Sequence, residues 1–226
     1  MKTITKIIEE QVNRWHLLNK EQPAEITGIS VITLSGEPGS NGRIVATRLA
    51  EELGIDIFHK EVINQIAKSA DVRVKLIESL DERGLSMLED WVSAAVLDRH
   101  LWPDEYSQHL MKAIGTIGKH GRAVIVGRGA NFILPAEKRF AVRIVAPIPW
   151  RVANIARQFS ITETEAKKRV LRTESERRSF IRKYFNADIS RPTNYDLVIN
   201  SATMSVDDSV KIISAALGML ECVFVG

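Results

Sequence analysis

Residues 29–44 read I-S-V-I-T-L-S-G-E-P-G-S-N-G-R-I, and this stretch decides the fold. Residues 29–34 are rich in β-branched side chains and end just before Gly36, which is typical of a buried strand. Over residues 43–53 apolar side chains recur at helical spacing, and Gly54 supplies the stop signal. The stretch therefore predicts a strand that turns through a glycine-rich loop directly into a helix.

The loop between this strand and this helix has the context of a phosphate-binding loop. Glycines let backbone N–H groups point at an anion, and the helix N-terminus adds partial positive charge. Compared with G-x-x-x-x-G-K-[ST], Glu37 replaces the first glycine, Arg43 the lysine, and Ile44 the hydroxyl that usually holds Mg²⁺. We predict that a phosphate-bearing ligand contacts the whole loop: Glu37, Pro38, Gly39, Ser40, Asn41, Gly42, Arg43 and Ile44. A tight turn without a ligand is the alternative.

The remaining pattern alternates strands with helices. Short apolar runs predict strands at residues 123–126, 140–146 and 197–199, and helical spacing predicts helices at 149–159, 162–185 and 206–220. Residues 60–119 are almost entirely helical in pattern, and residues 3–19 form an amphipathic helix followed by a linker to residue 28. Such alternation predicts an α/β fold with a parallel sheet.

Length and composition exclude several classes of protein. The chain has 226 residues, of which 45% are apolar and 26% charged, and its formal net charge is +3. That size suits one sizeable core with a small cap. No apolar run approaches the ~20 residues of a membrane span, and no signal peptide opens the chain. Cys222 is the single cysteine, which excludes an internal disulfide. We therefore expect a cytoplasmic protein without a membrane partner.

Positive charge is concentrated in one part of the chain. Nine lysines and arginines lie between Lys167 and Arg191, against Glu174, Glu176 and Asp188. Mixed charge on a helix is usually a solvated face, but the basic excess favours an anion-binding role here. His100, His109 and His120 lack ligand spacing, which excludes a zinc site.

Three segments, read together with the loop, identify a family. Residues 123–134 read A-V-I-V-G-R-G-A-N-F-I-L, residues 173–185 read T-E-S-E-R-R-S-F-I-R-K-Y-F, and residues 195–200 read Y-D-L-V-I-N. With the G-S-x-G-R form of the loop, this order resembles the cytidylate kinase-like family of P-loop nucleotide kinases. The resemblance covers about residues 29–217.

The resemblance implies both a fold and an activity. The fold would be a P-loop kinase fold: a five-stranded parallel sheet flanked by helices, a helical substrate-binding insert at about 60–119 and a lid at about 160–192. This domain would span residues 29–226, after an N-terminal helix and linker at 1–28. The activity would be transfer of the ATP γ-phosphoryl group, with Mg²⁺, to a nucleoside monophosphate such as CMP or a related small acceptor.

The resemblance also implies roles for single residues. Arg128 looks like the arginine that holds the acceptor phosphate, with Gly129 where the family's G-R-D turn has Asp. Arg172 and Arg177 resemble lid arginines that close over the phosphates, and Arg43 takes the place of the P-loop lysine. These four would be the catalytic residues. Substrate contacts are expected from Arg128, Lys60, Arg178 and Arg182.

Departures from the stricter cytidylate kinases leave two questions open. Around His59, Lys60 and Gln65 the chemistry differs from that family's acceptor-binding residues, so cytosine specificity is not implied. The strand 123–126 carries no carboxylate for a metal. Glu37, Ser40 and Glu174 are equal candidates for that role, so the metal ligands stay unassigned.

Two other classes of function compete with a kinase. The atypical loop fits a non-catalytic nucleotide-binding regulatory protein of the P-loop class. The basic run fits a nucleic-acid-binding protein, which ranks third because few aromatic residues interleave with it. For the N-terminal helix we favour docking on a second copy of the chain over packing on its own domain.

Overall fold

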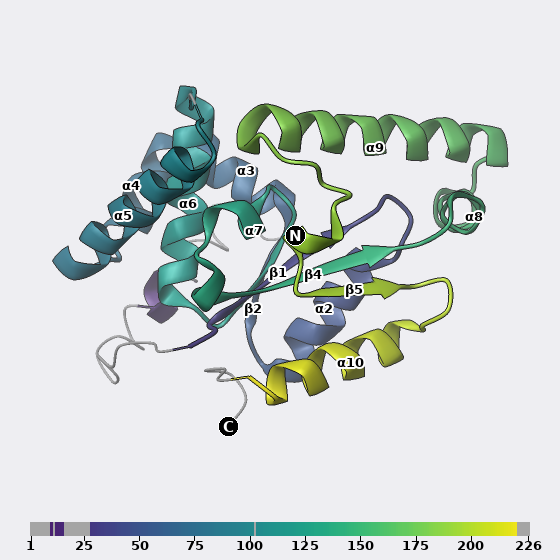
Figure 1. Ribbon diagram of the computed structural model, residues 1–226, viewed down its shortest axis with the longest axis horizontal. Helices are drawn as coiled ribbons and strands as arrows, with labels where there is room; N and C mark the ends of the chain where they lie inside the picture. Colours follow the sequence, from purple (N-terminus) through teal and green to yellow (C-terminus); the bar gives the residue numbers. More distant parts are fainter. Residues whose placement is uncertain (1–9, 11, 16–27, 102, 221–226) are drawn as a thin grey trace.

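The computed structural model describes residues 10, 12–15, 28–101 and 103–220 (Figure 1). Its centre is a five-stranded sheet in which every pair of neighbours is parallel, in the order β2-β3-β1-β4-β5. The strands are β1 (Val31–Gly36), β2 (Asp56–Phe58), β3 (Ala123–Val126), β4 (Arg139–Val145) and β5 (Leu197–Asn200). The predicted five-stranded parallel sheet is confirmed.

The strand predicted at residues 29–34 begins and ends two residues later. Gly36 still pairs in register with Ile144 of β4, so the ladder continues to the first residue of the glycine-rich loop. The other predicted strands agree with the structure within one residue at each end.

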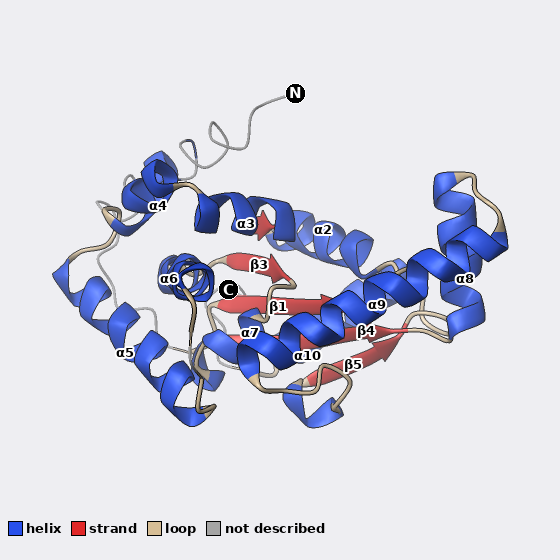
Figure 2. Cartoon of the chain, turned by 90° about the horizontal axis from the view of Figure 1, so that it is seen from above, coloured by secondary structure: helices blue, strands red, loops and turns tan. Residues whose placement is uncertain are grey.

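Helices connect all five strands. They are α2 (Gly42–Leu53), α3 (Lys60–Lys68), α4 (Ala70–Ile77), α5 (Glu82–Asp98), α6 (Glu105–His120), α7 (Ala130–Ile133), α8 (Ile148–Phe159), α9 (Glu163–Phe185) and α10 (Val206–Gly218), with short 3₁₀ turns at Ala136–Lys138 and Pro192–Asn194. Helix α9 begins at a capping box of Thr162 and Glu165 and ends at Asn186 in the left-handed region. These helices cover both faces of the sheet (Figure 2).

Alternate residues of β1, β2 and β3 enter two separate cores, whereas β4 and β5 contribute to one of them. On one face, Ile32 of β1 and Val124 of β3 pack with apolar residues of α2 and α10. On the other face, Val31 and Ile125 pack against α3, α6 and α7. Figure 1 shows α2 and α10 below the sheet and α9 running across its opposite side. The sheet is buried on both faces, as parallel sheets are.

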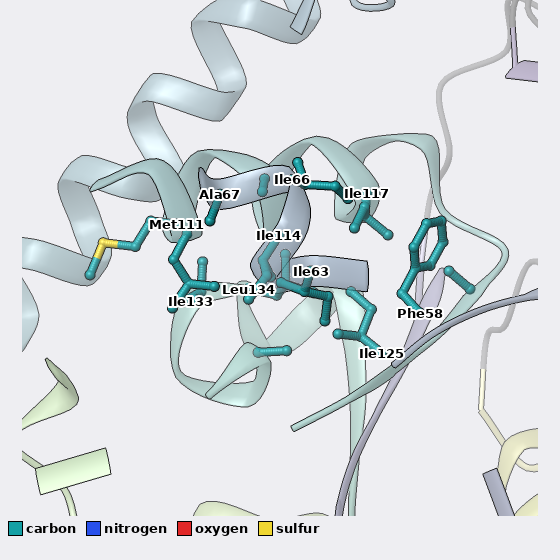
Figure 3. Close-up of a cluster of buried hydrophobic side chains, with 14 of the residues drawn as sticks. Phe58, Ile63, Ile66, Ala67, Met111, Ile114, Ile117, Ile125, Ile133 and Leu134 are labelled. Atoms are coloured by element: carbon teal, nitrogen blue, oxygen red, sulfur yellow. The ribbon is translucent and has the colours of Figure 1, made fainter. Parts of the chain in front are cut away.

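The residues predicted as the helical insert form α3, α4, α5 and α6. Ile63 and Ile66 of α3 and Ile114 and Ile117 of α6 are completely buried, and they meet Ile125 of β3 (Figure 3). This part of the chain therefore shares its core with the sheet. The N-terminus of α3 is fixed beside the end of β2.

Only part of the predicted N-terminal helix and linker lies among the described residues. Val12 and Trp15 are buried against their own chain, where the Trp15 ring stacks on His120 at 4.0 Å between centroids. The rest of the helix 3–19, the linker before Gly28 and Cys222 lie outside the described residues. The expected contact with a second copy stays a prediction.

None of the helices in the described ranges has the length and apolar character needed to cross a bilayer.

Candidate active site

A cavity of about 710 Å³ opens at the carboxyl ends of β1 and β3. Its walls come from the glycine-rich loop, the start of α3, the turn between β3 and α7, and one face of α9. The carboxyl edge of a parallel α/β sheet is where ligands usually bind. Two glycine motifs of the sequence, residues 36–42 and 127–129, each follow a strand. The structure brings both to this one cavity.

The glycine-rich loop, residues 36–42, is held by contacts from behind. Gly39 has φ +84°, and a Cβ there would lie 2.5 Å from the carbonyl oxygen of Arg151, so only glycine fits. The carbonyl of Gly39 accepts a hydrogen bond from Asn154 (3.1 Å), and that of Ser40 accepts one from the Ser201 hydroxyl (2.8 Å). Within the loop the Glu37 amide donates to the Ile144 carbonyl and the Ser40 amide to the Glu37 carbonyl, so the amides left for a ligand are those nearer the start of α2.

The loop leads into a helix N-terminus that has no side-chain cap. Asn41 takes the left-handed conformation at φ 59° and caps nothing with its side chain. The Ile44 amide donates to the Asn41 carbonyl, so the amides of Gly42 and Arg43 precede the first bond of the helix. Two free N–H groups and the helix dipole make this point favourable for a phosphate.

Glu37 lines the cavity, and its carboxylate is engaged by two buried arginines. One oxygen accepts from the Ala146 amide (3.0 Å) and lies 3.4 Å from Arg151 Nε, while the other lies 3.7 Å from Arg143. Arg151 also binds Glu174 at 2.8 Å. This network neutralises the Glu37 carboxylate and ties the loop to β4, α8 and α9.

The turn of Gly127, Arg128 and Gly129, called the G-R-G turn below, has three successive residues in the left-handed region, at φ 77°, 56° and 71°. A Cβ on Gly129 would lie 2.2 Å from the Phe185 ring, which is completely buried. The aspartate of the family's G-R-D turn therefore does not fit here. The turn lifts the Arg128 side chain into the cavity.

Arg128 is held in the cavity by an aromatic ring. Its guanidinium carbon lies 4.7 Å from the centroid of the Phe180 ring on α9. Its buried Nε has no hydrogen-bond partner, and no ion pair to Arg128 is found within the described ranges. A half-buried guanidinium with free N–H groups is suited to bind an anion.

Arg177 reaches the same cavity from α9. It donates a hydrogen bond to the carbonyl of Gly36, the first residue of the glycine-rich loop. Burial lowers the pKa of Arg177, and the nearby guanidiniums of Arg143 and Arg128 lower it further. Since like charges raise the cost of this arrangement, an anion between Arg128 and Arg177 would stabilise it.

The mouth of the cavity carries Arg43, Lys60 and Glu61. Arg43 is exposed and lies 3.8 Å from the Glu61 carboxylate, which is also 3.9 Å from Lys60. Burial lowers the pKa of His59, and the positive charge of Arg43 adds to this effect. Ile44 is exposed at this mouth and offers no metal ligand.

Three of the predicted arginines lie away from the cavity. Arg172 is 83% exposed and pairs with Glu176 at 2.8 Å, and Arg178 pairs with Glu174 at 3.3 Å. Arg182 is exposed as well. None of the three arginines lines the cavity itself, although the partner of Arg172, Glu176, does, and their roles stay predictions.

Several lining residues escaped the sequence analysis. They are Thr33, Glu61, Asn131, Arg169, Phe180 and Tyr195. For Phe180 a signal existed, because Ala166, Val170 and Ile181 mark the inner face of α9 and Phe180 falls beside it. The buried Thr33 hydroxyl, which has no partner, could not be recognised before the strands were paired.

Carboxylates are the groups to test against a bound Mg²⁺ ion. Glu37 and Glu174 are occupied by arginines, and the fully buried Ser40 hydroxyl donates to the Glu37 carbonyl at 2.8 Å. No cluster of three or more acidic, His or Cys ligands occurs within the described ranges. Mg²⁺ needs only one or two carboxylates when phosphates and water complete its shell. Glu61 is half exposed in the cavity lining and is held only by exposed pairs of 3.8 Å to Arg43 and 3.9 Å to Lys60, so its carboxylate fits that requirement best.

Comparison with known proteins gives concordant matches over most of the chain. The model of the cytidylate kinase-like family matches residues 31–203. The cytidylate kinase of Ignicoccus hospitalis is 26% identical over 189 residues, 84% of this chain and 99% of that protein. The cytidylate kinase of Pyrococcus furiosus is 28% identical over 195 residues, 86% of this chain and 91% of that protein.

A solved structure shares the fold. The crystal structure of an uncharacterized protein from Eubacterium ventriosum superposes with a TM-score of 0.68 at 19% identity, covering 84% of this chain and 98% of that one. The family match over residues 31–203 spans all five strands of the sheet and the loop after β1. The chain, with its P-loop kinase fold, belongs to the cytidylate kinase-like family.

Proposed function

We propose that this protein transfers the γ-phosphoryl group of ATP to a nucleoside monophosphate, with CMP as the first candidate acceptor. One observation carries the proposal: the free amides at the start of α2 and the guanidiniums of Arg128 and Arg177 line the same cavity. Phosphoryl transfer requires positioning of two phosphates and positive charge around the transferring group. Both requirements are met by residues of this cavity.

The residues divide into two groups in this proposal. The glycine-rich loop binds the phosphates of ATP through its amides, with Arg43 at the mouth. Arg128 binds the phosphate of the acceptor, and Arg177 neutralises charge on the transferring group. In this arrangement the two phosphates approach each other at the end of β1.

A phosphate acceptor suits the cavity better than an alcohol. The phosphate oxygen of a nucleoside monophosphate is already an anion near neutral pH, so no base is needed to remove its proton. Arg128 has no ion-pair partner within the described ranges, and a phosphate would satisfy its N–H groups. The curated relatives named cytidylate kinases support CMP as the acceptor to test first.

Mg²⁺ fits this site through Glu61. The ion would supply positive charge to the phosphates of ATP. Glu61 would hold it at the cavity mouth, and Glu37 would keep the loop in shape through Arg151 and Arg143.

The test is an assay of ADP release with Mg·ATP and a panel of acceptors: CMP, dCMP, UMP, AMP, GMP and shikimate. Release that depends on CMP or another nucleoside monophosphate is expected. Release with shikimate alone would contradict the nucleotide acceptor. ATP binding by calorimetry without any release would establish the non-catalytic alternative, and no ATP binding would contradict both. Binding of single-stranded or duplex nucleic acid with a steep salt dependence would favour the third class.

Two arginine substitutions sharpen the assay, each with a matched control. Arg128→Ala should lower kcat/KM for the acceptor by ~10²-fold or more, since it removes a charge-assisted contact. Arg122→Ala is its control, because Arg122 is also left-handed, at φ 47°, but is exposed just before the start of β3. Unchanged acceptor kinetics in Arg128→Ala would contradict its role.

The second substitution addresses the loop. Arg43→Ala should weaken ATP binding, and Arg48→Ala, on the same helix but paired with Asp207 at 3.5 Å, should not. An unaltered ATP Kd in Arg43→Ala would exclude Arg43 from the nucleotide site.

A further inference from the structure

We propose that Phe180 is a positioning residue that makes recognition of the acceptor phosphate depend on where α9 lies. This inference rests on the proposed function. It assigns to a side chain on the predicted lid the task of holding the acceptor-binding arginine of the sheet.

The first step is how few contacts hold Arg128. Its backbone is fixed by the G-R-G turn, where Gly127 N donates to the Leu34 carbonyl at 2.9 Å. Beyond the backbone, the long side chain has neither a hydrogen bond nor an ion pair within the described ranges. Its guanidinium lies over the Phe180 ring, with 4.7 Å between the guanidinium carbon and the ring centroid.

The second step is what a stacked guanidinium offers. An arginine lying over an aromatic ring is held by its face, and its N–H groups at the edge stay free. The cation–π contact therefore fixes the direction of the fork without consuming its donors. A phosphate then meets an arginine that has already lost most of its rotamer freedom.

The third step is the position of Phe180 on α9. It lies three residues after Arg177, which binds the Gly36 carbonyl of the glycine-rich loop, and both side chains line the cavity. Residues three apart share one face of a helix. One helix face thus contacts the loop on one side and Arg128 on the other, so a shift of α9 alters both.

The fourth step is how Phe180 itself is supported. Its ring packs against Tyr184 at 4.8 Å and Phe185 at 6.1 Å between centroids, and Phe185 is completely buried. The same Phe185 ring leaves no room for a Cβ at Gly129. The aromatic cluster of Phe180, Tyr184 and Phe185 therefore contacts both parts of this region. Phe185 packs against the G-R-G turn, and Phe180 packs against the side chain of Arg128.

The experiment is a double-mutant cycle on acceptor kinetics. Phe180→Leu, which removes the ring and keeps an apolar side chain, should lower kcat/KM for the acceptor roughly 5- to 30-fold. The KM for ATP should change by less than about twofold. Phe180→Tyr, which keeps a ring, should retain the wild-type value. In the Arg128→Ala background, Phe180→Leu should have no further effect.

Phe140→Leu is the control for loss of an aromatic ring from a core. Phe140 of β4 is buried in the core on the α2 and α10 face of the sheet and lies outside the cavity lining. It should lower the thermal midpoint as Phe180→Leu does while leaving acceptor kcat/KM within about twofold. If Phe180→Leu does not fold, Phe180→Met, which also lacks the ring, takes its place.

Three results would overturn the inference: the effect of Phe180→Leu persists in Arg128→Ala, Phe180→Tyr fails to restore activity, or the KM for ATP rises as much as that for the acceptor. In each case the wild-type protein still releases ADP in response to the acceptor, so the proposed function stands. A wild-type protein without acceptor-dependent release overturns the proposed function itself.

Discussion

The glycine-rich loop after β1 and the G-R-G turn after β3 end neighbouring strands, and different forces hold them. The loop is fixed by polar contacts on its outer side: Asn154, Ser201, and the pairing of Glu37 with Arg151. The turn is fixed by left-handed backbone and by aromatic rings of α9. The comparison indicates that the loop is held chiefly by contacts from α8 and from Ser201 after β5, whereas the side chain of Arg128 is held by α9.

The largest effect should come from a Cβ in the loop. Gly39→Ala places an atom against the backbone of Arg151, which cannot move aside, at φ +84°. ATP affinity should fall ~10²-fold or more, through strain of a few kcal/mol. Gly54→Ala, at φ +61° with open space around it, is the control and should leave ATP binding unchanged. Equal calorimetric Kd values for the two variants would show that the loop is less rigid than the structure indicates.

A corresponding test at the G-R-G turn compares the two glycines that flank Arg128. Gly129→Ala meets the buried Phe185 ring, whereas Gly127→Ala has nothing within 4 Å, although both have positive φ. Gly129→Ala should destabilise the fold by ~3 kcal/mol and raise acceptor KM, and Gly127→Ala should cost only ~1 kcal/mol of backbone strain. Urea unfolding and acceptor kinetics measure both. Identical values would mean that the aromatic cluster adapts freely.

Charge removal tests the polar side of the comparison. Glu37→Gln leaves Arg143 without a carboxylate and weakens the contact to Arg151, two arginines that are nearly buried. We expect a loss of ~2 kcal/mol in urea unfolding, since an uncompensated buried charge is costly. Glu176→Gln removes an exposed pair with Arg172 and should cost less than about 0.5 kcal/mol. If Glu37→Gln has the same free energy of unfolding as wild type, the network of Glu37 with Arg143 and Arg151 does not stabilise the fold.

The smallest effect concerns pH. The pKa of His59 lies below its ordinary value of 6.5, so the folded protein favours the neutral ring. This contribution to stability is complete above pH 6.5 and is lost as the pH falls through that value. His59→Gln should therefore show a flatter dependence of the unfolding free energy between pH 7 and about 5.5 than wild type. Parallel curves for the two proteins would assign the dependence to other groups.

Local sequence patterns predicted most of the fold. They were not used to predict which side chains of α9 face the core and which face solvent. The strands and helices followed from runs and spacing of apolar residues, because each element buries one stripe or one face. On α9 the same spacing places Arg177 with Val170 and Ile181, on the buried side, and Arg172 on the opposite side. The resemblance selected Arg172 together with Arg177 as lid arginines, and that choice did not take this phase into account.

The site was harder to predict where partners come from distant segments. Glu37 was expected among the phosphate contacts, yet its carboxylate faces Arg143 and Arg151, about a hundred residues later in the chain. Likewise, nothing local marks Phe180 as the neighbour of Arg128. Glycine positions are readable because they report on the backbone itself, but the partner of a charge depends on the packing of the whole domain.

Helix α9 can also be treated as a rigid rod that rotates about its last residue, Phe185. At about 1.5 Å per residue, Phe180 lies about 8 Å from this pivot, Arg177 about 12 Å and Arg169 about 24 Å. A swing of about 10° would then move them by about 1, 2 and 4 Å respectively. Such a rotation would therefore displace Arg177, which binds the glycine-rich loop, and Arg169 farther than the Phe180 ring that lies on Arg128.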